Sequence, residues 1–425
     1  MPKETQRPRR VSSGGGRAGF QRTPSAPRVR KGTVRISAEI ASHLRAGHPY
    51  LFREALGARP LREPAGEIID ILDDAGSFVA RGMYDPDGVV AVRVVTRDEG
   101  EAIDSAALLR RVSAARRLRQ SLLPESGMTA YRVFHGEGDL LPGVTVDRYG
   151  QHLVVHLFSP AIEPLRDGLY DALEATYQPR AIYEQRRYKP LAGEGPRGPA
   201  TLARGEVAPV EIEVEEHGLK FLVDVTAPLG TGLFPDLREG RRAVAERATG
   251  RRVLNLFSYT GAFSVWAARG GATEVVSVDL AAKAHARARR NLQLNGLPEK
   301  GHELIAGDAF PVLAKMAERG RKFDLLVLDP PSFSQAKGRV FSVQKDYREL
   351  VQAALSVSAS GALLACVSNT MKVSAEELDR AIGEAAFRAR RIVRVVERRG
   401  LPPDFPVPAG YLEGHYLKFF LCAVA

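Results

Sequence analysis

Cysteine is scarce in this sequence, and long apolar segments are missing. Only Cys366 and Cys422 occur among 425 residues, which is too few for a disulfide framework or a cysteine-based zinc site. No segment reaches the roughly 18 consecutive apolar residues of a membrane-spanning helix, and residues 1–33 lack the apolar core of a signal peptide. No two histidines show metal-ligand spacing. We therefore expect a cytoplasmic protein that holds no metal ion and has no membrane partner.

Acidic residues are nearly absent from the N-terminal segment, residues 1–33. This segment contains nine basic residues and one acidic residue, in a chain whose net charge is +11. It is rich in glycine, proline and serine and has few apolar side chains to bury, so we expect it to be disordered. Its charge suits contact with RNA phosphates, and a solvated tail without a partner is the alternative.

A dinucleotide-binding glycine motif is also missing, although three apolar segments are typical of buried strands in a parallel sheet. The segments span residues 253–257, 275–279 and 325–328, and each ends beside a polar residue. In an open α/β sheet such strand ends line the ligand crevice. The loop after the first segment has Gly261 as its single glycine, whereas a pyrophosphate site needs G-x-G-x-x-G. The sequence therefore favours a nucleoside ligand without pyrophosphate, and S-adenosylmethionine is such a molecule.

Three aspartates follow the strands of this predicted sheet. Asp279 lies 18 residues after Gly261, where a carboxylate can accept hydrogen bonds from the ribose hydroxyls. Asp308 follows a short predicted strand, residues 303–306, and is expected beside the adenine amino group. Asp329 begins an Asp-Pro-Pro loop that directs backbone carbonyls into the crevice, because proline has no N–H to donate. Asp279 and Asp308 are alternatively helix N-caps, but their order after successive strands favours a nucleoside site.

The remainder of the chain indicates further domains. Short apolar segments separated by turns over residues 34–95 are typical of a small β-barrel. A basic helix is expected over residues 108–122, with five arginines that face either RNA or solvent. Three strands are expected after this helix, and then a second helix over residues 162–177. A Gly- and Pro-rich linker over residues 191–205 and a hairpin over residues 210–225 then lead into the predicted parallel sheet.

Short motifs occur in a fixed order from residue 34 to the C-terminus. They include His48-Pro49, Gly136-Glu-Gly-Asp139, Leu141-Pro-Gly143, Asp147-Arg148, Glu216-His-Gly218, Thr231-Gly232, Asn255 to Gly261 and Glu413-Gly-His-Tyr-Leu-Lys418. With these motifs the chain resembles the bacterial large-subunit rRNA cytosine-5 methyltransferases. The resemblance implies an α/β fold in which a Rossmann-like class I methyltransferase domain follows a PUA-like β-barrel and a middle α/β domain. The expected boundaries are a basic tail 1–33, a PUA-like domain 34–100, a middle domain with linker 101–205 and a methyltransferase domain 206–425.

The resemblance also implies a cofactor site and a partner. The cofactor is S-adenosylmethionine, and the substrate is rRNA of the large subunit or its precursor particle. Residues expected to line the cofactor are Phe257, Ser258, Tyr259, Thr260, Gly261, Asp279, Asp308 and Asp329. Residues expected to close over it are Thr231, Asp236 and Arg238.

The chain departs from this family at the catalytic cysteine. An ungapped match places Ser368 where the family has the cysteine of a Ser-Cys-Ser-type turn. Cytosine C5 is a weak nucleophile until a thiolate adds to C6, and a serine hydroxyl without an activating base cannot replace that thiolate. Cys366 lies two residues earlier on the same face of the predicted strand. It is either a small core residue or a displaced nucleophile.

A second resemblance points to a different target atom. The run Pro331–Ser334 with Lys337, then residues 343–346 and Ser368-Asn369, resembles the guanine-N7 methyltransferase module of a related rRNA enzyme. Guanine N7 carries an in-plane lone pair, so its methylation needs positioning rather than a covalent intermediate. We therefore expect methylation of a ring nitrogen such as guanine N7, with cytosine C5 and an inactive RNA-binding assembly factor as alternatives. The residues expected at the reacting base are Asp329, Pro330, Pro331, Phe333, Ser368 and Asn369.

Overall fold

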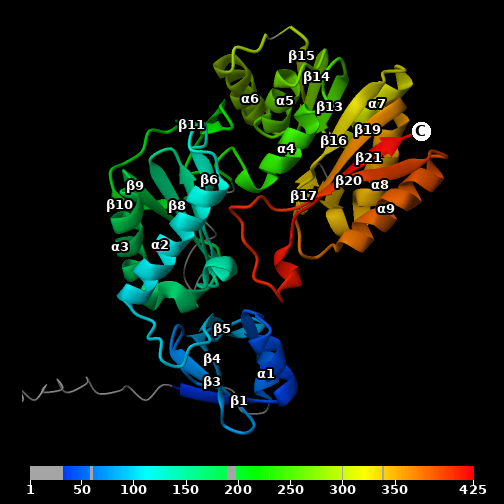
Figure 1. Ribbon diagram of the computed structural model, residues 1–425. Coiled ribbons are helices and arrows are strands. Elements are labelled where there is room, and N and C mark those ends of the chain that lie inside the picture. Colours follow the sequence, from blue (N-terminus) through cyan, green and yellow to red (C-terminus); the bar gives the residue numbers. More distant parts are fainter. Residues whose placement is uncertain (1–31, 58–60, 189–197, 229, 299, 337–338) are drawn as a thin grey trace, which may run out of the picture. The chain divides into compact units, whose positions relative to one another are not determined.

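The computed structural model describes residues 32–425, except residues 58–60, 189–197, 229, 299 and 337–338 (Figure 1). The side chains of residues 333–341 are not described either. The predicted basic tail, residues 1–33, therefore lies outside the described residues apart from its last two positions. Among the described helices, none is both long and apolar enough to cross a membrane.

The N-terminal sheet forms where the small β-barrel is predicted. Its five strands are ordered β1-β3-β4-β5-β2, and only β1 and β3 among these neighbours pair in parallel. Leu44 of helix α1 is buried together with Ile69 of β3 and Val92 of β5, so the helix closes the apolar core of this sheet. The elements are β1 (Gly32–Ile36), α1 (Ala38–Arg45), β2 (Tyr50–Phe52), β3 (Ile68–Asp73), β4 (Phe78–Tyr84) and β5 (Val90–Thr96).

The middle sheet has five strands in the order β10-β9-β8-β7-β6. Val146 of β7 and Val155 of β8 share a buried core with Leu108 of α2 and Leu169 of α3. Side chains alternate along a strand. The residues that directly precede and follow each of these valines therefore lie on the opposite face of the sheet. The elements are α2 (Ser105–Leu122), β6 (Ala130–His135), β7 (Val144–Tyr149), β8 (His152–Leu157), η3 (Pro160–Leu165), α3 (Arg166–Tyr177), β9 (Ala181–Arg186) and β10 (Thr201–Gly205).

The C-terminal sheet has seven strands in the order β15-β14-β13-β16-β19-β21-β20. Strands β13 to β16 and β19 are parallel, whereas β21 is antiparallel to both of its neighbours. The strand order reverses between β13 and β16, which opens a crevice at the carboxyl ends of these strands. The strands are β13 (Arg252–Leu256), β14 (Glu274–Asp279), β15 (His302–Ala306), β16 (Phe323–Leu328), β19 (Ser358–Ser368), β20 (Val393–Arg399) and β21 (Lys418–Val424).

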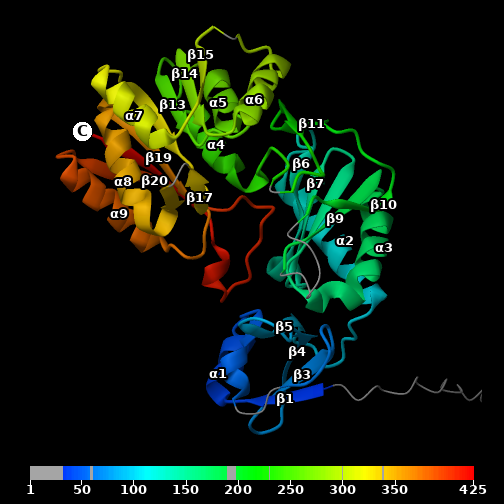
Figure 2. The ribbon, with the colours of Figure 1, turned by 180° about the vertical axis from the view of Figure 1, so that it is seen from behind.

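Helices cover both faces of this sheet (Figures 1 and 2). Val253 packs in one core with Ala243 of α4 and Phe263 of α5, and its neighbour Leu254 packs in another core with Leu350 of α8. Burial on both faces explains why the strands read as continuous apolar segments. The helices are α4 (Arg238–Ala245), α5 (Ala262–Arg269), α6 (Ala282–Leu294), α7 (Ala309–Glu318), α8 (Val343–Ser356) and α9 (Ala375–Arg388). Two hairpins lie outside these three sheets, β11 (Ile212–Glu216) with β12 (Leu219–Val223) and β17 (Phe333–Ala336) with β18 (Arg339–Ser342).

Two predicted elements differ from the structure. The helix predicted over residues 162–177 is a 3-10 helix, η3, followed by α3, because Pro164 removes a backbone donor inside the turn. The predicted linker 191–205 ends in strand β10, which pairs with β9 through a register shift at Leu202. The pairing partner lies elsewhere in the chain, so the composition of the segment does not reveal it.

Two arginines of the basic helix α2 are structural. Arg111 is 8% exposed and donates to Glu101 Oε2 at 2.9 Å. Arg119 is 2% exposed, and its two terminal nitrogens each donate to the Asp139 carboxylate at 2.7 Å. For these two residues the prediction that the arginines of this helix face RNA or solvent is wrong. Their charge is used inside the protein.

Candidate active site

The loop between β13 and α5 is held in an unusual backbone conformation. Phe257, Tyr259 and Gly261 have φ angles of +60°, +47° and +77°, in a region that residues with a side chain rarely adopt. A Cβ atom at Gly261 would lie 2.8 Å from Cβ of Ala288 in α6. The close approach of α6 therefore gives a packing reason for glycine at this position.

This loop forms one wall of a cavity of about 330 Å³ at the carboxyl ends of the strands. Phe257, Ser258, Tyr259 and Thr260 line the cavity, and Gly261 is not among its lining residues. The Ser258 hydroxyl is buried and has no hydrogen-bond partner among the described residues. A buried polar atom without a partner is costly. The wall of the cavity thus presents a hydrogen-bonding group that a ligand would satisfy.

Asp279 and Asp308 line the same cavity from the ends of β14 and β15. Asp279 accepts hydrogen bonds from the backbone N–H groups of Tyr259 and Ala281, both at 2.8 Å. Asp308 is the N-cap of α7 and accepts from the backbone N–H of Phe310 at 2.9 Å. A carboxylate has about four acceptor positions, so both groups keep capacity for a ligand. The cap and the ligand-facing alternatives are thus compatible at Asp308.

The Asp-Pro-Pro loop after β16 also contributes to the cavity wall. Asp329, Pro330, Pro331 and Asn369 all line the cavity. Burial and the neighbouring carboxylate of Asp236 raise the pKa of Asp329 to about 7, while Arg241 lowers it. The loop is connected to the end of β19, because Ser332 Oγ donates to Asn369 Oδ1 at 3.0 Å.

The segment from Gly230 to Phe234 also contributes to the cavity wall. Most of its lining residues are not predicted from the sequence. Gly230, Gly232, Leu233 and Phe234 line the cavity. The Tyr259 hydroxyl donates to the carbonyl oxygen of Gly230 at 2.8 Å, and the Tyr259 and Phe234 rings lie 5.6 Å apart. The signal that indicates this segment is the Thr231-Gly232 motif, which does not show which neighbours face the ligand.

Arg241 also lines the cavity, and it is part of a buried ion pair. Its guanidinium donates to both carboxylate oxygens of Glu216, at 2.7 and 2.5 Å, and to the carbonyl oxygen of Phe234 at 2.9 Å. Trp266 Nε1 donates to the same carboxylate at 2.9 Å. The Glu216-His-Gly218 motif therefore supports the cavity wall from β11.

The three residues expected to close over the cofactor are not among the lining residues of this cavity. Thr231 and Asp236 line a second, larger cavity next to the first, and the Tyr416 hydroxyl donates to Asp236 Oδ2 at 2.9 Å. Arg238 is 1% exposed and forms an ion pair with Asp404. It lines neither cavity. For Arg238 the geometry indicates a structural role, in which α4 is joined to the segment before β21.

The two candidate nucleophile positions on β19 are both buried. Cys366 and Ser368 are each 0% exposed, and neither lines the cofactor cavity. The Cys366 thiol packs with Tyr347 and Cys422, and contact with Cys422 together with burial raises its pKa well above the usual range. A thiol in such surroundings does not form the thiolate that a nucleophile needs. The side chain of Phe333, the remaining expected catalytic residue, lies outside the described residues.

The strand order and the cavity at the switch point define a class I methyltransferase. Residues 131–416 match the model of the S-adenosylmethionine-dependent methyltransferase family, and residues 34–97 match a PUA-like domain. The chain belongs to the S-adenosylmethionine-dependent methyltransferase family, and its cofactor is S-adenosylmethionine. The unpartnered Ser258 hydroxyl and the carboxylates of Asp279 and Asp308 fit this molecule, which offers an ammonium group, a carboxylate, a ribose and an adenine amino group.

Similar proteins cover nearly the whole chain. The protein of Escherichia coli O139:H28 named "Ribosomal RNA large subunit methyltransferase I" is 37% identical over 377 residues, which are 89% of this chain and 95% of that protein. The protein of the same name from Photobacterium profundum is 35% identical over 90% of this chain and 96% of that protein. A methyltransferase solved in complex with SAH is similar in structure, with a TM-score of 0.85 at 25% identity. The similarity covers 92% of this chain and 100% of that chain. A SAM-dependent methyltransferase from Streptococcus mutans has a TM-score of 0.82 with the same identity and coverage.

Proposed function

We propose that this protein transfers a methyl group from S-adenosylmethionine to a base of large-subunit rRNA. The observation that carries the proposal is the similarity over 95% of the length of relatives whose names state this activity. The PUA-like match at residues 34–97 supports it, as does a net charge of +11 that suits a polyanionic partner. Such an enzyme would act where ribosomes are made, in the cytoplasm, on free rRNA or on a precursor particle.

The atom that we propose is a ring nitrogen, with guanine N7 as the preferred target. Ser368 replaces the family's cysteine, and the nearby Cys366 thiol is fully buried with a raised pKa. Neither side chain can add to C6 of cytosine as a thiolate does. A ring nitrogen presents its lone pair directly, so the protein has only to bind and orient the base.

The roles of the site residues follow from their positions. S-adenosylmethionine supplies an electrophilic methyl group on a positively charged sulfur. Asp279 would bind the ribose and Asp308 the adenine edge, while Ser258 to Thr260 would bind the amino-acid part. Asp329, Pro330, Pro331 and Asn369 line the same cavity and would hold the reacting base. Asp236 raises the pKa of Asp329. It lines the adjoining cavity and would contact the base from that side.

Cytosine C5 is the second candidate, because the order of motifs along the whole chain resembles the cytosine-5 enzymes. A trapping experiment distinguishes the two chemistries. RNA that contains 5-fluorocytosine forms a denaturation-resistant adduct with an enzyme that attacks C6 through a thiolate. We expect no adduct with the wild type, and we expect Cys366→Ala to retain methyl transfer. An adduct that disappears in Cys366→Ala would overturn the ring-nitrogen assignment.

The substrate class is tested separately. Purified protein with radiolabelled S-adenosylmethionine should label unmodified large-subunit rRNA and leave small-subunit rRNA and transfer RNA unlabelled. Equal labelling of all three, or none, would contradict the proposed substrate. An inactive assembly factor, the third alternative, would bind large-subunit rRNA without labelling it.

A further inference from the structure

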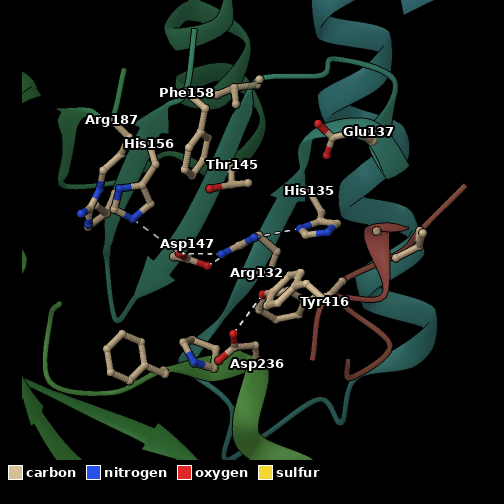
Figure 3. Close-up of a pocket in the computed structure, with 18 of the residues that line it drawn as sticks. Arg132, His135, Glu137, Thr145, Asp147, His156, Phe158, Arg187, Asp236 and Tyr416 are labelled. Atoms are coloured by element: carbon tan, nitrogen blue, oxygen red, sulfur yellow. Dashed lines mark hydrogen bonds and ion pairs between the residues drawn. The ribbon is translucent and has the colours of Figure 1, made fainter. Parts of the chain in front are cut away.

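A second cavity lies on the face of the middle sheet opposite α2 and α3. Its volume is about 640 Å³, roughly twice that of the cofactor cavity. Strands β6 to β9 contribute polar residues to its lining, among them Arg132, Thr145, Asp147, His156 and Gln185. Figure 3 shows Arg132 of β6, Asp147 of β7 and His156 of β8 near one another in this cavity. A sheet face that carries this many half-buried or buried polar groups differs from an ordinary packing surface.

Ion pairs fix the polar groups of this cavity in place. Arg132 donates to both oxygens of Asp147, at 2.6 and 3.1 Å, and to His135 Nδ1 at 2.8 Å (Figure 3). The guanidinium also lies 4.4 Å from the centre of the Phe405 ring. Burial and the charge of Arg132 hold the pKa of His135 well below its usual range, so this histidine accepts the hydrogen bond as a neutral group. The cavity is therefore organised before any ligand enters.

Two polar atoms of residues that line this cavity, the Thr145 hydroxyl and His156 Nδ1, lack a hydrogen-bond partner among the described residues. Thr145 is 8% exposed, and its hydroxyl has no hydrogen-bond partner among the described residues. In Figure 3 its side chain lies between Phe158 and the pair formed by Arg132 and Asp147. Phe158 is 47% exposed although it borders the cavity. The cavity thus offers an unsatisfied hydroxyl beside an accessible aromatic ring.

These features match the chemistry of a single nucleotide. A base out of its stack presents donors and acceptors on its edge, and its faces stack on aromatic rings or guanidinium planes. Phe158, which is 47% exposed, supplies such a face, and the Thr145 hydroxyl supplies an edge contact. A free phosphate ion would use the arginines and leave the aromatic wall without a function.

A nucleotide bound in this cavity would be distinct from the one that is methylated. A reacting atom must lie about 3–3.5 Å from the methyl group, which confines the methylated base to the cofactor cavity. The two cavities share only Gly230 and Phe234 among their described lining residues, and Thr145, Asp147 and His156 line only the second cavity. A base that contacts Thr145 therefore lies in a different cavity from the one that Asp329 lines.

We propose that the cavity on the middle sheet binds one unstacked nucleotide of the RNA substrate, next to the methylated nucleotide in the strand. The adjoining cavities would then fix the register of the RNA, because a neighbouring base must enter one cavity before the target base reaches the other. This inference rests on the proposed function in one respect, namely that the substrate is RNA.

The first test measures binding without methyl transfer. Fluorescence anisotropy with single-stranded RNA 12-mers of mixed sequence should give an affinity about tenfold lower for Phe158→Ala and about fivefold lower for the isosteric Thr145→Val. The matched control is Phe387→Ala, which changes a phenylalanine that is 85% exposed and lines neither cavity. The affinity for S-adenosylmethionine should stay unchanged in all three variants. Equal RNA affinity in wild type and both cavity variants would overturn the proposal, as would inhibition by inorganic phosphate that equals inhibition by a mononucleotide.

The second test identifies the bound nucleotide. Each nucleotide around the methylated position of an rRNA fragment is made abasic in turn, and the affinities of wild type and Phe158→Ala are compared. At one neighbouring position the abasic RNA should bind both proteins equally, since the missing base and the missing ring remove the same contact. The same result at the methylated nucleotide itself, or at no nucleotide, would overturn the proposal. If no rRNA is methylated at all, the proposed function fails, while the oligonucleotide test still decides the inference.

Discussion

The cofactor cavity and the middle-sheet cavity are built in different ways. In the cofactor cavity, Asp279 ends β14 and Asp308 lies just after β15, and backbone N–H groups hold both carboxylates. Two of these donors lie two residues away, and the third belongs to Tyr259 in the loop after the neighbouring strand β13. In the middle-sheet cavity, Arg132 and Asp147 stand within two strands and are held by each other. The first arrangement depends on the local order of the chain, and the second depends on the register between strands. The two cavities should therefore respond differently to the loss of a single side chain.

The largest expected effect is on stability, in the middle-sheet cavity. Arg132→Met leaves the 5%-exposed carboxylate of Asp147 without its partner, and an unpaired buried charge costs about 3–5 kcal/mol. Arg180→Met is the matched control, because Arg180 pairs with Glu206 at 2.9 Å while both side chains are more than half exposed. The control should change the free energy of unfolding by less than about 1 kcal/mol. Urea unfolding curves that shift equally for both variants would refute the contrast between the two pairs.

The next largest effect is on catalysis, in the cofactor cavity. Asp329→Ala should lower kcat for methyl transfer about a hundredfold, because misplacing the base by about 1 Å has a cost of that order. Asp324→Ala changes an aspartate near the opposite end of β16, where it pairs with Arg252 at 3.0 Å, and should leave kcat near the wild-type value. Steady-state rates at saturating cofactor measure this difference. A kcat for Asp329→Ala within threefold of the control would contradict the placement of the base.

Removal of either carboxylate from the cofactor cavity should weaken the binding of S-adenosylmethionine, by different amounts for Asp279 and Asp308. Asp279→Ala removes a charged acceptor, which we expect to weaken binding by about 1.5–3 kcal/mol. Asp308→Ala should weaken binding less, because Asp308 is expected to accept from the adenine amino group alone, whereas Asp279 is expected to accept from the ribose hydroxyls. Calorimetric titration with S-adenosylmethionine gives both values. Unchanged affinity in Asp279→Ala would exclude its assignment to the ribose.

The smallest expected effect is a dependence of stability on pH that arises from Asp329. Its pKa is raised to about 7 in the folded protein from the ordinary value of 3.8, so its contribution to stability is present below about pH 4 and is lost as the pH rises through 7. At about 1.4 kcal/mol per pKa unit the upper bound is about 4 kcal/mol, and water in the cavity reduces the expected loss to about 1 kcal/mol. Asp329→Asn should abolish this loss and be more stable than wild type at pH 8. Parallel curves for both proteins between pH 5 and pH 8 would refute the raised pKa.

The cofactor cavity could largely be predicted from the sequence, because its signals are local. The strand predicted over residues 253–257 is shifted by one residue from β13. Ser258, Asp279, Asp308 and Asp329 line one cavity as their order after the strands indicates. The close packing of Gly261 against Ala288 could not be predicted, because Ala288 belongs to another helix.

The middle-sheet cavity could not be predicted from the sequence. Asp147 belongs to a motif, but its partner Arg132 and the ring of Phe405 belong to other segments. The same limit applies to Arg238, whose partner Asp404 lies 166 residues away in the sequence. Contacts of this kind depend on the packing of whole domains, which local patterns do not specify.

The central claim is that the protein methylates a ring nitrogen of a large-subunit rRNA base without a covalent intermediate. Mass spectrometry of nucleosides from the large-subunit rRNA of a deletion strain tests it most directly. We expect the strain to lack one 7-methylguanosine, which returns on expression of the wild type or Cys366→Ala and stays absent with Asp329→Ala. Loss of a 5-methylcytidine that Cys366→Ala fails to restore would contradict the account.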